Sequence, residues 1–238
     1  MSDGQKTGAG VKTEGHTVKR FDAELNRLQL RVLEIGGLAL SQIKDALHAL
    51  KHKDLALARN IAPRENRIDL LEVETDADII GLIARRCPVG GDLRLVMAVS
   101  KSVTDLERVG DEAIRLANIV LQIYGNGGGE PNERLLRDAY VMGSLAVNAL
   151  EKALHAFDNL DEAAALDIIA AHRQLEEEFE AGLRRLMTYV MEDVRNIGFA
   201  VSMVLAIKGL ERIGAHAQNL AEYVIYQVEG KDVRHQGP

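Results

Sequence analysis

The sequence predicts an all-α protein made of two tandem three-helix bundles related by an internal repeat. Apolar residues recur at spacings of three and four along nearly the whole chain, which is the period of an amphipathic helix. No segment shows convincing strand character. A phrase of eight residues also occurs twice, as LERVGDEA at 106–113 and as LERIGAHA at 210–217. Such self-similarity indicates two copies of one structural unit.

The offset between the two copies of this phrase is 104 residues. Carried backward without a gap, the same offset pairs Glu72 with Glu176, Glu74 with Glu178, Asp76 with Glu180 and Leu82 with Leu186. The copies differ at an acidic position that matters for metal binding, because Asp111 of the first copy corresponds to Ala215 of the second.

The first bundle is expected at 17–125, after a disordered tail at 1–16. Apolar spacing predicts a helix over 21–50 and a second over 54–85, which Pro63 should bend. The turn PVGG at 88–91 follows, and Asp92 is suited to cap a third helix that reaches about Tyr124. Glycines make 126–130 the predicted linker between the bundles.

The second bundle is expected at 131–230, followed by a C-terminal tail at 231–238. Pro131 can begin a helix that runs to about Phe157, and a turn at 159–161 leads into a helix that ends near Met191. The last helix should cover about 196–228. Two bundles of three antiparallel helices follow from this order.

Composition excludes several classes of function. The formal net charge of −7 opposes broad affinity for nucleic acid. No apolar run is long enough for a membrane span, and the first 16 residues lack the apolar centre of a signal peptide. A single cysteine excludes an internal disulfide and fits a reducing cytoplasm. The sequence has no phosphate-binding loop, nucleophile elbow, zinc-finger spacing or basic patch. A cytoplasmic protein that is not an enzyme is therefore expected.

A helical wheel of the helix at 92–124 separates two groups of charges. One arc, predicted to be a solvated stripe, collects Arg94, Lys101, Asp105, Arg108 and Glu112. Glu107 lies about 120° from the middle of that arc and Asp111 lies at its edge, so this pair faces partly toward the protein or a groove. Two carboxylates one turn apart repel each other, which predicts a cation beside them.

The helix at 54–85 carries a second acidic row. It consists of Asp69, Glu72 and Asp76 and, less cleanly, Glu74 and Asp78, with a similar stretch at 176–180. Carboxylates from neighbouring helices are a common way for a bundle to hold metal ions. From spacing alone, solvated helix faces paired with Arg108 and Arg212 are the more common explanation for such rows.

Several phrases in order, namely 86–97, 105–111, 189–193, 210–217 and 229–235, resemble the two halves of the PhoU family of bacterial phosphate-signalling regulators. The resemblance covers about 21–235. It implies two three-helix bundles and metal clusters of divalent or ferric ions, such as iron, zinc, manganese or magnesium. It also implies restraint of phosphate-starvation signalling and modulation of phosphate uptake. In that family the protein links the ATPase subunit of the phosphate ABC transporter to a sensor histidine kinase.

The resemblance also implies which residues bind metal. The first pairs are Glu72 with Asp76 and Glu107 with Asp111, and the second set is Glu176, Glu180 and Glu211. Ala215 stands where the family has an aspartate, and its methyl group cannot bind metal, so a weakened second site is expected. Long amphipathic helices with Leu- and Ala-rich faces favour a homodimer. The resemblance further implies that the transporter holds this cytoplasmic protein at the inner face of the membrane, without membrane insertion.

Two alternatives remain open. A ferritin-like di-metal carboxylate protein, acting as an oxidase or a store, would need Glu-x-x-His pairs that the sequence lacks in the required places. His48, His155, His172 and His216 stand singly and are more typical of polar faces or satisfied core positions than of metal ligands. A purely structural helical adaptor, with acidic rows that are only solvated, is the other alternative.

Overall fold

The computed structural model describes residues 19–125 and 133–233. Within these ranges the ordered structure is helical and contains no strand. The predicted disordered tail at 1–16, the linker at 126–130 and the end of the C-terminal tail lie outside the described residues. None of the helices in the described ranges combines the length and the apolar composition that a membrane span requires.

All the predicted long helices are present, with ends within two residues of the predicted ones. They are α1 (Lys19–His52), α2 (Leu55–Arg59), α3 (Ala62–Arg86), α4 (Gly90–Gly125), α5 (Glu133–Asn159), α6 (Glu162–Glu192) and α7 (Ile197–Glu229), with a 3₁₀ turn at Val194–Asn196. The bend predicted near Pro63 is a break between α2 and α3. Pro63 lies in the first turn of α3, where its missing N–H removes no helical hydrogen bond.

The two copies begin their second helical segment in the same way. The carboxylate of Asp54 accepts a hydrogen bond from the Leu57 amide at 2.9 Å, and Asp161 accepts one from the Ala164 amide at 3.0 Å. The residue before each cap has a positive φ. Asp161 follows Asp54 by 107 residues, not 104, so the gapless alignment of the repeat is wrong in this region.

The offset of 107 continues along α3 and α6. It pairs buried positions with buried positions: Ala58 with Ala165, Ile61 with Ile168, Ile68 with Leu175, and Ile79 with Leu186. The phrase in α4 and α7 keeps its offset of 104, so the second copy is three residues shorter between α6 and α7. Consequently Glu72 corresponds to Phe179 and Asp76 to Leu183, whereas Glu176 corresponds to Asp69 and Glu180 to Val73.

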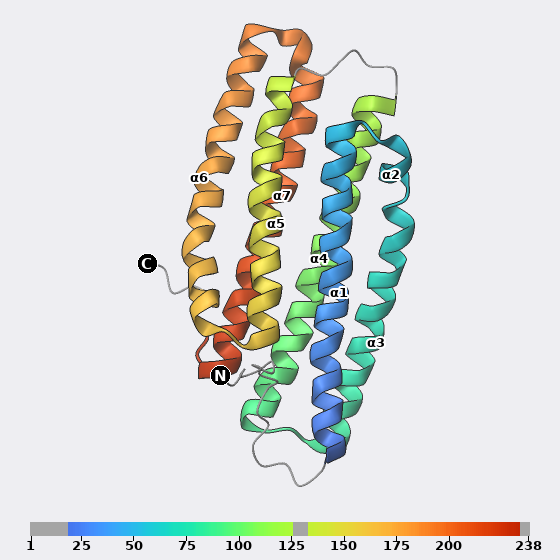
Figure 1. Cartoon of the computed structure of the whole chain (residues 1–238), viewed down its shortest axis with the longest axis vertical. Helices are drawn as coiled ribbons and strands as arrows, with labels where there is room; N and C mark the ends of the chain where they lie inside the picture. Colours follow the sequence, from blue (N-terminus) through green and yellow to red (C-terminus); the bar gives the residue numbers. More distant parts are fainter. Residues whose placement is uncertain (1–18, 126–132, 234–238) are drawn as a thin grey trace, which may run out of the picture.

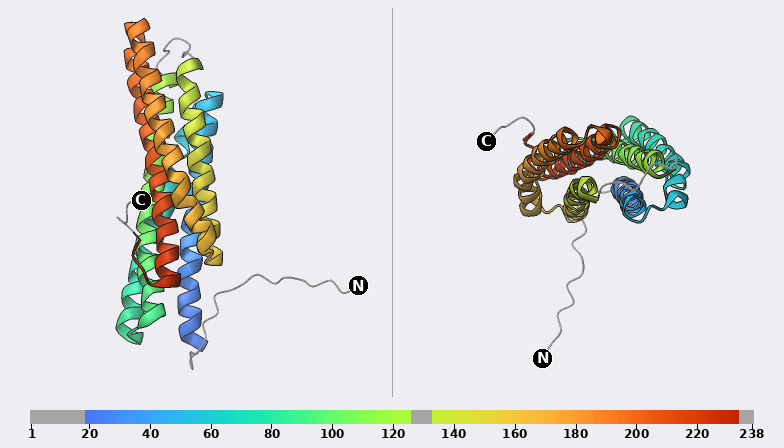
Figure 2. Two further views of the ribbon diagram at one scale, coloured as in Figure 1. Left: turned by 90° about the vertical axis from the view of Figure 1, so that its left-hand side faces the viewer. Right: turned by 90° about the horizontal axis from the view of Figure 1, so that it is seen from above.

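The helices run along one long axis and form a single body. Figure 1 shows α1, α3 and α4 on one side and α5, α6 and α7 on the other. In the end view of Figure 2, α3 and α6 lie at the two outer ends, with α1, α4, α5 and α7 between them. One core of mainly Ala, Leu, Ile and Val side chains continues through both halves.

Contacts between the halves are reciprocal. Leu154 of α5 packs on Gly36 of α1, and Leu47 of α1 packs on Gly143 of α5. Each member of the first contact corresponds at an offset of 107 to a member of the second. Two copies related by a twofold rotation produce such pairs of contacts.

The α4–α7 contact corrects the predicted solvated stripe, because Asp105 and Glu112 are both buried. The Asp105 carboxylate lies 2.8 Å from His216 Nδ1 and accepts a hydrogen bond from the Tyr223 hydroxyl at 2.8 Å. Glu112 lies 2.7 Å from the Arg212 guanidinium of α7. The prediction from the helical wheel was wrong here because a wheel considers one helix alone and takes no account of charged partners on a neighbouring helix. His216 is a satisfied core histidine, as predicted.

Candidate functional site

The acidic residues of α3 and α4 lie along two adjacent antiparallel helices. The Thr104 hydroxyl donates a hydrogen bond to Glu72 Oε1 at 3.2 Å, which fixes the register of the pair. Glu107 and Asp111 therefore lie opposite Asp69 and Glu65, because α4 runs forward as α3 runs back. Glu65, Asp69, Glu72, Glu107 and Asp111 are called the acidic cluster below.

Glu65 is the member of the cluster that sequence reasoning missed. Only 4% of it is exposed, and its carboxylate lies directly on Gly110 of α4, where any side chain would clash with it. Both of its oxygens are buried without a hydrogen bond of normal geometry. A carboxylate in this condition is costly, since it has lost water and has only Gln42 beside it as a weak donor. The glycine that follows Arg108 and Val109 in the repeated phrase thus makes room for a buried acid.

The electrostatics of the cluster follow from burial and like charge. Burial, assisted by the charges of Asp69, Asp111 and Glu107 and partly opposed by Gln42, raises the pKa of Glu65 to about 7. Burial is also the main cause that raises the pKa of Glu72, for which Asp76 and Asp69 add repulsion and Thr104 opposes the shift.

The pKa of Glu107 is likewise raised by burial and then by the charges of Asp111, Glu72 and Asp69. The acids thus act on one another electrostatically across the two helices. Excess negative charge with few donors is the condition that favours a bound cation.

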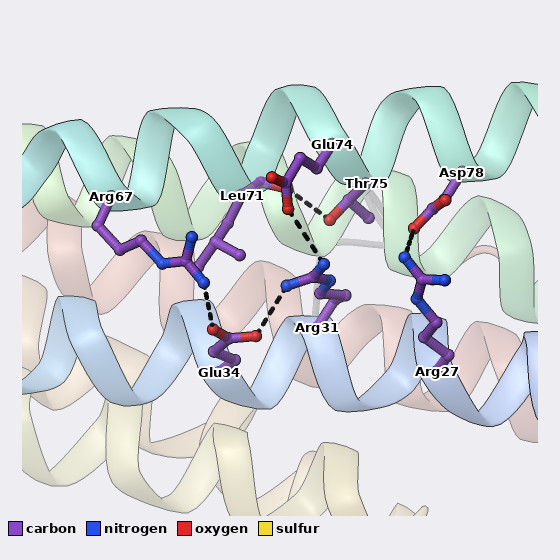
Figure 3. Close-up of polar contacts among 8 residues, drawn as sticks. All are labelled: Arg27, Arg31, Glu34, Arg67, Leu71, Glu74, Thr75 and Asp78. Carbon is purple, nitrogen blue, oxygen red and sulfur yellow. Dashed lines mark hydrogen bonds and ion pairs between the residues drawn. The ribbon is translucent and has the colours of Figure 1, made fainter.

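The remaining acids of α3 face elsewhere. Asp76 is exposed one turn beyond Glu72. Glu74 and Asp78 point toward α1, where they lie 3.1 Å from Arg31 and 2.9 Å from Arg27 (Figure 3). These two carboxylates are therefore neutralised by α1 and do not belong to the acidic cluster.

The described residues of the second half assemble no equivalent cluster. Glu176 and Glu180 are more than half exposed, and their partners are on α6 itself: His172 at 3.6 Å and Arg184 at 3.4 Å. Glu211 of α7 pairs with Lys208 at 2.6 Å. The structure thus places the three predicted residues of this half on separate polar contacts.

An apolar contact occupies the place of the buried acid in the second half. Leu175, not a carboxylate, packs on Gly214, the counterpart of Gly110. The connection from α6 to α7 is three residues shorter than the one from α3 to α4. As a result, α6 is displaced along α7 by almost one helical turn when compared with the position of α3 along α4.

No three His, Cys, Asp or Glu side chains of the described chain stand together as a ready metal site. The metal-ligand role of the seven predicted residues therefore stays a prediction. What the structure does bring together is Glu72, Glu107 and Asp111 with the two acids that sequence reasoning did not select as ligands, Glu65 and Asp69.

Comparison with known proteins identifies the family. The PhoU domain matches residues 32–120 and 140–224. A protein of Burkholderia sp named as a homolog of the phosphate-specific transport system accessory protein PhoU is 41% identical over 226 residues, covering 94% of each chain. The accessory protein PhoU of Escherichia coli K12 is 33% identical and covers 93% of this chain and 90% of its own.

Solved structures agree with these matches. The crystal structure of PhoU from Pseudomonas aeruginosa superposes with a TM-score of 0.83 at 37% identity, over 89% of this chain and 100% of that one. The phosphate transport regulatory protein PhoU from Streptococcus pneumoniae gives 0.80 at 29% identity, over 90% and 99%. The six long helices, the repeated phrase and these matches over nearly the full length lead to one conclusion: the chain belongs to the PhoU family.

Proposed function

We propose that this protein is an accessory regulator of phosphate transport that restrains phosphate-starvation signalling. The observation that carries the proposal is the match over more than nine-tenths of the chain to proteins named as phosphate-specific transport system accessory proteins. The helical body, with long exposed helix faces on both halves, is suited to binding other proteins and needs no catalytic centre for that role. We further propose the transporter ATPase subunit and a sensor histidine kinase as its partners.

The test is a clean deletion of the gene, read with a phosphate-starvation reporter at high external phosphate. Loss of the restraint should switch the reporter on, and a plasmid copy of the intact gene should switch it off again. Normal repression in the deletion strain, with no second copy of the gene present, would overturn the proposed regulation.

The proposed regulator binds metal at the acidic cluster of the first half. Glu65, Asp69, Glu72, Glu107 and Asp111 would supply the ligands, and Asp76 lies one turn away. Three features of the chain fit such an ion: buried carboxylate oxygens without donors, carboxyl groups of raised pKa, and a glycine that admits one acid between the helices. Oxygen ligands of this kind suit hard cations such as Mg²⁺, Mn²⁺ or Fe³⁺, and they accept Zn²⁺.

A bound cation would neutralise the repulsion within the cluster and hold α3 against α4. It would do so only if the side chains rotate toward a common point, since they do not yet form a ready site. Glu176, Glu180 and Glu211 are each paired with a different basic side chain, so the proposed site belongs to the first half alone.

A homodimer is also proposed. Apolar side chains are exposed along the end of α6 and the start of α7: Met187, Met191, Val194, Ile197, Val201 and Leu205. Exposed apolar side chains gathered in this way favour contact with another protein surface. The double change Val201→Glu and Leu205→Glu should convert dimer to monomer in light scattering while the helical circular dichroism stays unchanged. A wild-type protein that is monomeric at all concentrations would contradict the proposal.

A further inference from the structure

A cavity of about 250 Å³ opens between α5 and α6 in the second half. Its apolar floor is formed by Leu145, Ile168 and Leu175, and Lys152 and His172 supply charged and polar groups. An engineered cavity of about 150 Å³ is large enough to hold benzene, so a ring-sized molecule fits this space. The cavity lies on the far side of the protein from the α3 acids and shares none of their residues.

The same place in the first half is filled by side chains. Arg64 of α3 pairs with Asp45 of α1 and donates a hydrogen bond to the Ser41 hydroxyl at 2.9 Å. Gln42, which is 1% exposed, lies beside the buried Glu65. Large polar side chains thus stand in the first half at the positions that line the cavity in the second.

The offset of 107 identifies the cause of the difference. Arg64 corresponds to Ala171 and Gln42 corresponds to Ala149, and both alanines line the cavity. At both positions, a large side chain in the first half is thus replaced by a methyl group in the second. The two truncations open a groove at the surface, whose rim residues Asn148, Lys152 and Asp167 are exposed. A groove with a ring-sized volume, an apolar floor and a few polar groups is typical of a site for a small ligand.

The charged residues around the cavity also differ between the two halves. Asp45 corresponds to Lys152, and Glu65 corresponds to His172. Lys152 has no ion-pair partner among the described residues, and Asn148, the counterpart of Ser41, adds an amide at the rim. Asp167 is the one acid of the lining, and it would repel an anion placed on its side of the opening. Glu176 lies outside the lining but 3.6 Å from His172 Nε2, so Lys152 is the cation of the site and His172 is shared with Glu176. An anionic group would therefore lie toward Lys152 and His172, with its apolar part on the floor.

We propose that this second-half cavity binds a small organic anion, with an apolar body between α5 and α6 and a carboxylate or phosphoryl group at Lys152 and His172. Lysine binds such groups as a point charge, and histidine adds a hydrogen-bond donor. The first half cannot bind the same molecule, because Arg64 and Gln42 occupy the space.

The test titrates the full-length protein with four probes that share a phenyl ring, benzoate, phenyl phosphate, benzamide and benzamidine, and follows amide NMR shifts. Ala149→Gln fills the cavity as the first half does and keeps Lys152. Lys152→Met removes the charge and keeps the volume. Lys51→Met removes a cation from the separate α1–α5 groove and serves as the matched control.

The proposal predicts that benzoate or phenyl phosphate shifts α5 and α6 amides and binds about tenfold more tightly than benzamide. Lys152→Met should reduce the anion to the affinity of benzamide, Ala149→Gln should weaken all probes, and Lys51→Met should change nothing. The relative affinity of the two anions assigns the carboxylate or the phosphoryl group. Absence of binding, a preference for benzamidine, or loss of binding in Lys51→Met alone would overturn the proposal.

Discussion

Two buried carboxylates show how differently this fold treats the same chemical group. Burial acts to raise the pKa of Asp105, but hydrogen bonds from His216, Tyr223 and Asn219 outweigh it and hold that pKa below its usual range. Glu65 is buried to the same extent on Gly110, receives no comparable donors and is surrounded by other acids. Asp105 thus stabilises the contact between the halves as an anion, whereas Glu65 is stable only when protonated or beside a cation.

The first prediction concerns Glu65. Its pKa is raised in the folded state, so its ionisation costs folding free energy, and metal-free wild type should lose stability as pH rises from about 4.5 to about 7. Glu65→Gln should remove that loss and raise the free energy of unfolding at pH 8 by on the order of 2 kcal/mol. Urea unfolding at pH 5 and pH 8 measures the effect. The exposed Glu180→Gln serves as a control, and a wild-type pH slope retained in Glu65→Gln would refute the assignment.

At the scale of single helices, the spacing of apolar residues predicted each long helix and most of its ends. The capping role of Asp161 was not anticipated, although the turn at 159–161 was. What sequence could not predict depends on a second helix. Glu65 falls in the interior of the helix predicted over 54–85, where nothing in the sequence marks it as buried, and only its contact with Gly110 of α4 shows why it is. The sequence did not reveal that the offset changes from 107 to 104, because the acids at 176–180 also align with acids of the first copy at the incorrect offset of 104.

Adjacent glycines of α1 give a matched test of the helix contact between the halves. A methyl group at Gly36 would clash with Leu154 of α5, whereas one at Gly37 meets nothing within 4 Å. Gly37→Ala should therefore raise the free energy of unfolding by about 0.5–1 kcal/mol through helix propensity. Gly36→Ala should lower it by about 1–3 kcal/mol through overpacking. Chemical denaturation of both variants decides the matter, and equal effects would show that α1 and α5 do not pack as described.

At the scale of the whole molecule, the two copies have diverged in opposite directions. The first half retains acids on both α3 and α4, fills the space between α1 and α3 with Arg64 and Gln42, and carries the proposed metal site. The second half has lost the counterpart of Asp111, places Leu175 on its glycine and opens a cavity instead. A pseudo-symmetric body with two chemically different halves could respond to two different ligands through one shared core.

The acidic cluster of the first half is proposed to bind metal, and the second half is proposed to have no equivalent site. The most direct test of this proposal is the number of ions bound per chain, measured by native mass spectrometry after loading with Mg²⁺, Mn²⁺, Zn²⁺ or Fe³⁺. Three matched variants separate the halves: Glu107→Ala with Asp111→Ala, Glu176→Ala with Glu180→Ala, and Ala215→Asp.

Wild type should bind at least one of these metals. The double change at Glu107 and Asp111 should abolish binding, because it removes the α4 side of the cluster. The double change at Glu176 and Glu180 should leave the stoichiometry unchanged, and Ala215→Asp alone should add no ion, because Phe179 and Leu183 stand where the first copy has Glu72 and Asp76. Metal bound equally by wild type and the Glu107–Asp111 variant, or lost from the Glu176–Glu180 variant, would contradict the account.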